Sequence, residues 1–470
     1  MRGRRRSCRG GSSSQLVPDD SFSIDEEISH LTKLSSEPSH STGRFIQGNH
    51  KKPPSSFKLL AGREGTGRLS LADRAYVMGR HLPLKGPWFL DCMDSEAYVS
   101  RFSDDGSLFV AGFRGSHIRI YDVQKGWKVQ KDIIARSLRW TITDTSLSPD
   151  QHYLAYASLT PIVHVVNVQT GGTESYANVT DVHEGLDFSH GFSDYSDDDD
   201  YSFGIFSIKF SMDGREIVAG TNNDSIYVYD LLANKVSLRL VAHTADVNVV
   251  TFADETGNII FSGSDDSLCK VWDRRCFTRE KPAGVLAGHL DGITFIDSRG
   301  DGRYFISNGK DQAIKLWDIR KMSSSVKFSI PRAYDWDYRW MVYPSEARHM
   351  KHPHDQSLAT FRGHSVLRTL IRCYFSPALS TGQRYIYTGS SDKCVYIYDI
   401  VSGEIVAKLG WHGSIIRDCS WHPHHPTLVS SSWDGYVVRW EASGDDADPS
   451  SLKAKNQRRH FETYQMSFEL

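Results

Sequence analysis

Three groups of histidine, serine and aspartate recur along the chain in the same order, and these residue types can perform hydrolysis. The sets are His243, Ser262 and Asp266; His289, Ser307 and Asp311; and His412, Ser430 and Asp434. A serine activated by a histidine, which an aspartate orients, is the arrangement of many hydrolases. An enzyme needs one such site, whereas this chain repeats the pattern. The repetition favours a structural role, and we expect neither catalytic residues nor enzyme activity.

A second histidine group could bind a metal. His422, His424 and His425 lie in the segment WHPHHP, which we place in a turn between strands. Zinc sites usually complete such a set with cysteine or carboxylate ligands, and no such cluster accompanies these histidines. The seven cysteines are scattered and contain no C-x-x-C pair, which argues against a zinc site or a disulfide framework. We therefore expect no metal and no cofactor.

A twelve-residue frame occurs seven times and explains most of the chain. Small residues and a turn precede an alternating strand that ends in an aromatic residue and usually an acid. The frames are 111–122, 156–167, 219–230, 262–273, 307–318, 388–399 and 430–441. Another strand and a turn with Ser-Pro-Asp or Asp-Gly character lie upstream of most frames. Four short strands per repeat, spaced mostly by 42–45 residues, predict an all-β, seven-bladed propeller over residues 67–442.

These repeats resemble the WD-repeat family over roughly residues 85–442. In that family a histidine, a strand serine or threonine, a turn aspartate and a tryptophan form a buried hydrogen-bonded tetrad. The resemblance implies tetrads that combine the three sets above with Trp272, Trp317 and Trp440, respectively. The sixth repeat has His364, Thr388 and Asp392, but Tyr398 replaces the tryptophan. The first three repeats lack the aspartate, with Gly115, Thr160 and Asn223 in its place.

The last blade lacks an outer strand of its own, and two segments near the N-terminus could supply it. One is the segment from Trp88 to Met93, and the other is 68–79. Closing the ring in this way removes exposed strand edges. An insertion at 180–204 carries five aspartates within 194–200, and we place the outer strand of the second blade before it, at 173–179. The acidic stretch is then a top-face loop, either solvated or a contact for a basic partner.

A second insertion, 321–356, lies between the third and outer strands of the fifth blade. It contains YDWDYRWMVYP, in which alternate positions are aromatic. We expect this loop to open on the bottom face of the propeller. The aromatic residues either pack back onto the blade or meet a partner. Trp336, Tyr338 and Trp340 are the candidate contacts.

The chain ends are predicted to be extensions of the propeller. Residues 1–66 read as a flexible, basic N-terminal extension, largely disordered, with an amphipathic helix near 23–35 and a linker from 37. Ile24, Ile28 and Leu31 share one face of that helix. The arginine-rich start is typical of a transit peptide, a nuclear-import patch or a disordered tail. Residues 443–470 read as a polar tail.

Overall charge and hydropathy limit the classes of partner. Lys+Arg total 55 and Asp+Glu total 57, so direct nucleic-acid binding is not indicated. No apolar run approaches the ~18 residues of a membrane helix, and we expect no membrane partner.

Two neighbouring repeats end in W-D-x-R, and the other repeats do not. Asp273 is followed by Arg275, and Asp318 by Arg320. Because five repeats manage without the arginine, it is not a requirement of the blade. Arginine is enriched at protein interfaces, where its planar group makes paired hydrogen bonds. The two arginines therefore suggest a protein partner.

The doubled motif resembles that of the substrate receptors of cullin-four RING ubiquitin ligases. Those receptors use it, often with a short helix ahead of the propeller, to bind the damaged-DNA-binding adaptor protein. The segments WDYRW, GHSVLRTLIRCYFSP and TGQRYIYTGSSDKCVYIYD further resemble the plant "LEC fourteen B" WD-repeat proteins and animal WD-repeat protein twenty-three. The resemblance implies adaptor binding by Asp273, Arg275, Asp318, Arg320, Ile24, Ile28 and Leu31.

The resulting hypothesis is a non-catalytic substrate receptor, present in nucleus and cytoplasm, whose protein substrate the sequence does not identify. The alternative is a general WD-repeat scaffold in a chromatin, RNA or signalling complex without a cullin partner. An enzyme built on the propeller is a third alternative, and no further motif supports it.

Overall fold

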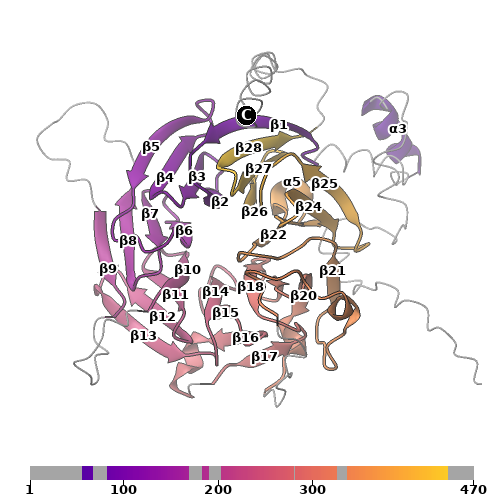
Figure 1. The fold of residues 1–470 in the computed structure, drawn as a ribbon. Coiled ribbons are helices and arrows are strands. Elements are labelled where there is room, and N and C mark those ends of the chain that lie inside the picture. The colour runs from indigo at the N-terminus through magenta and orange to yellow at the C-terminus, as the bar shows by residue number, and fades with distance from the viewer. Residues whose placement is uncertain are drawn as a thin grey trace, which may run out of the picture.

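A computed structural model describes residues 56–66, 82–168, 183–189, 203–279, 281–324 and 336–442. Within these ranges the strands form seven four-stranded antiparallel sheets, arranged as blades around an axis (Figure 1). The fold is the predicted seven-bladed β-propeller. The innermost strand of each blade faces the axis, and the outer strand lies at the circumference.

The blades follow one another in chain order. Blade 1 contains β2 (Ala97–Phe102), β3 (Leu108–Phe113), β4 (His117–Asp122) and β5 (Lys128–Ile134). Blade 2 contains β6 (Asp144–Leu147), β7 (Tyr153–Ala157), β8 (Ile162–Asn167) and β9 (His183–Asp187). Blade 3 contains β10 (Ile205–Phe210), β11 (Glu216–Thr221), β12 (Ser225–Asp230) and β13 (Lys235–Val241). Blade 4 contains β14 (Val247–Phe252), β15 (Ile259–Ser264), β16 (Leu268–Asp273) and β17 (Gly284–Ala287).

The last three blades complete the ring. Blade 5 contains β18 (Ile293–Ser298), β19 (Tyr304–Gly309), β20 (Ala313–Asp318) and β21 (Ala359–Arg362). Blade 6 contains β22 (Cys373–Phe375), β23 (Tyr385–Thr388), β24 (Cys394–Asp399) and β25 (Ile405–Gly410). Blade 7 contains β26 (Ile416–Trp421), β27 (Thr427–Ser432), β28 (Tyr436–Glu441) and, from the other end of the chain, β1 (Lys85–Cys92).

Ring closure uses the segment that begins just before the first repeat. β1 pairs antiparallel with β28, so that Lys85 faces Glu441 and Cys92 faces Tyr436. Of the two predicted segments, the one around Trp88 supplies the missing strand, and 68–79 lies outside the described residues. Pairing between the two ends of the propeller leaves blade 7 with a complete sheet.

Two expectations about the connections are wrong. The outer strand of blade 2 is β9 at 183–187, not 173–179, and it pairs with β8. The strand therefore lies inside the predicted insertion 180–204. Helix α3 (Ser56–Thr66) occupies part of the predicted linker. The helix expected at 23–35 and the acidic stretch 194–200 lie outside the described residues.

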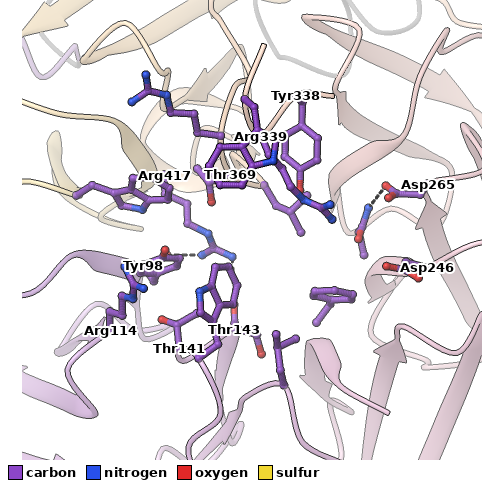
Figure 2. Close-up of a pocket in the computed structure, with 18 residues that line it drawn as sticks. Tyr98, Arg114, Thr141, Thr143, Asp246, Asp265, Tyr338, Arg339, Thr369 and Arg417 are labelled. Carbon is purple, nitrogen blue, oxygen red and sulfur yellow. Dashed lines mark hydrogen bonds between the residues drawn. The ribbon is translucent and has the colours of Figure 1, made fainter. Parts of the chain in front are cut away.

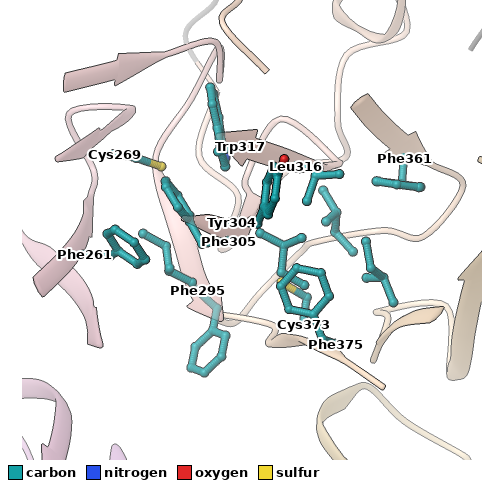
Figure 3. Packing of buried hydrophobic residues seen from close by; sticks show 14 of the residues in the cluster. Phe261, Cys269, Phe295, Tyr304, Phe305, Leu316, Trp317, Phe361, Cys373 and Phe375 are labelled. Carbon is teal, nitrogen blue, oxygen red and sulfur yellow. The ribbon is translucent and has the colours of Figure 1, made fainter. Parts of the chain in front are cut away.

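Packing between blades forms the core. The third strand of blade 5, β20, is buried at all its positions because another strand flanks it on each side and other blades cover its faces. The outer strand β13 alternates between accessible and covered positions. Figure 3 shows a cluster between blades 4, 5 and 6, in which the rings of Phe261 and Phe305 lie 4.4 Å apart. Each such buried side chain stabilises the fold by ~1.5–3 kcal/mol.

Short helices occupy several connections. They are η1 (Arg274–Arg279), η2 (Ile319–Lys321), η3 (Glu346–His349) and α5 (Ala378–Thr381). Among the described residues, no helix combines the length and apolarity needed to cross a membrane.

Candidate protein-interaction sites

The propeller has two faces, and the repeat assigns different turns to each. We call top the face that carries the loops entering each inner strand and the turns between second and third strands. The bottom face carries the turns between first and second strands and those between third and outer strands. Each predicted tetrad places its histidine and aspartate at the top, whereas Asp273 and Asp318 end third strands at the bottom.

The three sets of histidine, serine and aspartate form closed hydrogen-bond chains with tryptophan. In blade 5, His289 Nδ1 lies 3.0 Å from Asp311 and its Nε2 lies 2.6 Å from the Ser307 hydroxyl. Trp317 donates its indole N–H to the same hydroxyl at 2.7 Å. The sets His243, Ser262, Asp266, Trp272 and His412, Ser430, Asp434, Trp440 repeat this connectivity. Each serine is fully buried and its hydroxyl is engaged twice, so it is not placed to attack a substrate.

The electrostatics of the blade 5 tetrad suit a buried structural pair. Burial by itself would raise the pKa of Asp311, but the adjacent His289 and Lys315 outweigh it and hold that pKa at about 2. The carboxylate therefore stays ionised and accepts hydrogen bonds from the histidine and from the backbone of Leu290. This arrangement joins the top loop of one blade to its central strands.

Blade 6 replaces the tetrad with other contacts. His364 lies 3.0 Å from the Tyr398 hydroxyl and 3.0 Å from the Asn308 side chain of blade 5. Thr388 donates instead to the backbone carbonyl of Arg372, and Asp392 accepts from Tyr396 and Lys408. The tyrosine in place of tryptophan thus changes the partners of the histidine.

The WHPHHP histidines form a turn. His422 Nδ1 accepts from the backbone N–H groups of His424 and His425, at 3.1 and 3.0 Å. Its Nε2 lies 3.1 Å from the Gly106 carbonyl of blade 1. Burial, followed by the nearby His425, lowers the pKa of His422 to about 4. Both ring nitrogens are therefore engaged. The described residues include no group of three or more histidine, cysteine or carboxylate side chains that could hold a metal.

The first W-D-x-R segment forms a two-bond fork at the bottom rim of blade 4. Arg275 Nε and Nη2 donate to the two oxygens of Asp273 at 2.9 and 2.8 Å. The backbone N–H of Arg275 also donates to Asp273, at 3.0 Å. The aspartate at the strand end thus orients the arginine that follows it, and the Arg275 side chain remains 66% exposed.

The second segment forms the same local turn at the rim of blade 5. The backbone N–H of Arg320 donates to Asp318 at 3.0 Å, and its guanidinium donates to the same carboxylate at 3.2 Å. Arg303 donates to Asp318 as well, at 2.9 Å. The Arg320 side chain is 58% exposed. Two exposed arginines therefore occupy corresponding positions on adjacent blades.

The second insertion does not stay on the bottom face, which corrects our expectation. It leaves β20 at the bottom, but Tyr338 lies at the top, where Lys310 Nζ is 4.1 Å from its ring centroid. The Tyr338 carbonyl accepts from the backbone N–H of Arg368 in the loop entering blade 6, at 2.7 Å. The chain then returns along the blade, where the Lys315 ammonium forms an ion pair with the Asp355 carboxylate just before β21 begins. These contacts join distant positions, and the alternating pattern carried no sign of them.

The aromatic residues of the insertion divide between packing and exposure. The Trp336 indole donates to the Val342 carbonyl at 3.1 Å, and its ring meets that of buried Tyr343 edge to face at 5.0 Å. Trp340 is 84% exposed. Part of the segment thus folds on itself. Trp340 lies at the surface, beside the top opening of the central channel around which the blades are arranged, which we call the channel mouth.

A cavity of about 720 Å³ opens at this mouth (Figure 2). Its walls come from blades 1, 2, 3, 4, 6 and 7 and from the insertion of blade 5. Most of these residues belong to no motif in the sequence, because top-face loops are free to vary within the repeat. Their shared signal is a large aromatic or cationic residue in a top loop or turn, or beside one. The principal side chains are Tyr98, Arg114, Trp140, Arg339, Trp340, Arg368, Arg417 and Trp433.

Comparison with known proteins agrees with this geometry. The WD domain, G-beta repeat family matches residues 234–273, 280–318, 355–399 and 403–441. The fold and its tetrads thus define a WD-repeat propeller. The chain is 62% identical over 457 residues to the "LEC14B homolog" of Prunus armeniaca, covering 96% of this chain and 95% of that protein. It is 62% identical to the "LEC14B protein" of Lithospermum erythrorhizon over 93% of this chain and 92% of that one. The chain belongs to the LEC14B family.

More distant relatives carry another name. The "DDB1- and CUL4-associated factor 11 homolog" of Caenorhabditis elegans is 37% identical over 394 residues, which cover 80% of this chain and 66% of that protein. The protein of the same name from Caenorhabditis briggsae is 34% identical over 79% of this chain and 68% of its own length.

Proposed function

We propose that this protein is a non-catalytic substrate receptor of a cullin-four RING ubiquitin ligase. The observation that carries the proposal is the pair of exposed, aspartate-oriented arginines on adjacent blades, Arg275 and Arg320. The bottom face would bind the damaged-DNA-binding adaptor, and the top face would hold a protein substrate. The names of the Caenorhabditis relatives, which join DDB1 and CUL4, support the same partners. Ubiquitin transfer would belong to other subunits of the ligase.

The physical basis is the preorganisation of the two guanidinium groups. Arginine carries several rotatable bonds, and holding them costs about 0.5–1.5 kcal/mol of side-chain entropy on binding. Asp273 and Asp318 already fix the direction of these side chains in the free protein, so less entropy is lost. A guanidinium group carries five N–H donors in a planar fork, which suits carboxylate or carbonyl acceptors on a partner.

The test is co-purification of the adaptor with the Arg275→Asp/Arg320→Asp variant. We expect loss of the adaptor with an unchanged melting temperature, because both side chains are mainly exposed. A matched control is Arg139→Asp/Lys393→Asp, which reverses two exposed charges on the top face. The control should retain the adaptor. Undiminished co-purification with the arginine variant would refute adaptor docking through this rim and favour a general scaffold.

A further inference from the structure

We infer that the top-face cavity is a binding site for a phosphorylated peptide segment. The inference extends the proposed function, because it names the chemistry of the protein that the top face would hold. Its first basis is size and position: a cavity of about 720 Å³ at the channel mouth is within the usual range of ligand pockets. A side chain of an extended segment could enter it while the rest of that segment lies across the face.

The second basis is the convergence of arginines from separate parts of the chain. Arg114 follows β3, Arg339 belongs to the insertion of blade 5, and Arg368 lies in the loop entering blade 6. Arg339 and Arg368 are exposed, and Arg114 forms an ion pair with Glu96 at 2.9 Å. The blade fold does not require these cations, since most other repeats have different residues in these loops. Several guanidinium groups around one cavity favour a dianionic phosphate, which can accept several charge-assisted hydrogen bonds.

The third basis is a buried cation that is already held in place in the wall of the cavity. The buried Arg417 donates to the carbonyls of Tyr98 and Thr143, the latter at 3.3 Å. Figure 2 shows Arg114 and Arg417 on one side of the cavity and Asp246 and Asp265 on the other. An anionic group would therefore be attracted to the side formed by blades 1 and 7.

The acidic side of the cavity is largely compensated. Asp265 accepts from Lys310 Nζ at 2.7 Å and from Asn248 at 2.6 Å. Asp246 is half-buried, and burial followed by the nearby Asp265 raises its pKa. These carboxylates thus offer limited opposition to an anion on the far side of the cavity.

The fourth basis is the aromatic rim. Trp340 and Trp140 are both exposed, and the Trp140 ring meets Tyr98 edge to face at 5.8 Å. Exposed tryptophans beside a cationic cavity suit an apolar side chain that neighbours the anionic group in the bound segment. The combination predicts phosphoserine or phosphothreonine next to an aromatic or aliphatic residue.

Peptide libraries provide a direct test with the purified full chain. The central residue is fixed as phosphoserine, glutamate or serine, and the flanking positions are degenerate. We expect the phosphoserine library to be captured about tenfold more than the others, with apolar residues enriched beside the phosphate. Arg114→Gln/Arg368→Gln should remove the phosphate preference. Trp340→Ala should keep that preference and lose the apolar enrichment. Arg215→Gln, an exposed arginine at the bottom of blade 3, is the matched control.

Several outcomes would overturn the inference. If the glutamate library is captured as well as the phosphoserine library, the site recognises any acidic side chain. If all three libraries are captured equally, the cavity is not an anion-binding site. Retained phosphate preference in the double arginine variant would place the site elsewhere. Adaptor co-purification, measured in parallel, separates this inference from the proposed function. The cavity variants should keep the adaptor, and Arg275→Asp/Arg320→Asp should keep peptide capture.

Discussion

The W-D-x-R segments of blades 4 and 5 have the same motif but different supports. Asp273 is 21% exposed and is bound by Arg275, while the adjacent Arg274 turns away to Glu216 at 2.6 Å. Asp318 is 4% exposed and is bound by both Arg320 and Arg303. The local sequence thus pairs the arginine with the aspartate at the strand end in both blades. The turn before the second strand determines how many groups hold that aspartate.

The source of the difference is the residue just before the second strand of the blade. In blade 5 this is Arg303, which also lies 4.4 Å from the Tyr304 ring centroid, and in blade 4 it is Asn258. Blade 6 has an equivalent contact, since Arg384 donates to Asp399 at 2.6 Å. Two positions after this aspartate, blade 6 has Val401, whereas blades 4 and 5 have an arginine. The arginine before the second strand therefore binds the aspartate even in a blade that lacks the arginine two positions after it. Support of the aspartate and presence of the exposed arginine are separable features.

The largest expected effect comes from removing the two aspartates. Asp318→Ala leaves Arg303 and Arg320 without their shared carboxylate in a partly buried site, and we expect the free energy of unfolding to fall by about 3 kcal/mol. Asp273→Ala removes a more exposed pair and should cost about 1 kcal/mol or less. Urea denaturation of both variants measures the difference. Equal losses would show that the contact between Arg303 and Asp318 adds nothing to the free energy of unfolding.

As the pH falls, the contribution of blade 6 to stability should be lost before that of the tetrad in blade 5. Burial lowers the pKa of His364 to about 4, so folding favours its neutral form. The stability that this preference provides is present above the normal histidine pKa of ~6.5 and is lost as pH falls toward 4, by about 3 kcal/mol. Asp311, with its pKa at about 2, loses its contribution only between about pH 4 and 2.

The check is the pH dependence of the unfolding midpoint for His364→Gln. The variant should be less stable at pH 7 but should show a shallower decline between pH 6.5 and 4 than the unmodified chain. The decline that remains reflects other buried histidines, including His422. A slope identical to that of the unmodified chain would exclude His364 as the group responsible.

The smallest expected stability effect sharpens the comparison between the two arginines. Arg275→Gln and Arg320→Gln should each change the free energy of unfolding by about 0.5 kcal/mol or less, because both side chains are mainly exposed. Adaptor affinity, measured by titration, should fall more for Arg320→Gln, since the blade 5 fork is the better supported. A larger loss of adaptor affinity for Arg275→Gln would mean that the contact area each arginine makes with the partner matters more than its preorganisation in the free protein.

The repeat pattern was sufficient to predict the architecture, and the family resemblance implied the residues of three tetrads. Turn chemistry and strand alternation are local properties, so seven blades follow from short segments. The sequence left two candidates for the closing strand, and its pairing with β28 decides for the one near Trp88. The outer strand of blade 2 was misplaced, because its pairing with β8 spans an insertion whose length hides the repeat. The helix face of Ile24, Ile28 and Leu31 stays a prediction.

The position of Trp340 shows what only the tertiary structure decided. The sequence by itself determined that the insertion follows the third strand of blade 5 and contains alternating aromatic residues. It did not determine the face on which they lie, because that depends on Lys310 and Arg368, which meet Tyr338 only in the folded ring. In the same way, the two W-D-x-R segments are visible in the sequence. The support of Asp318 by Arg303 and the convergence of arginines on the top cavity arise from packing between distant segments.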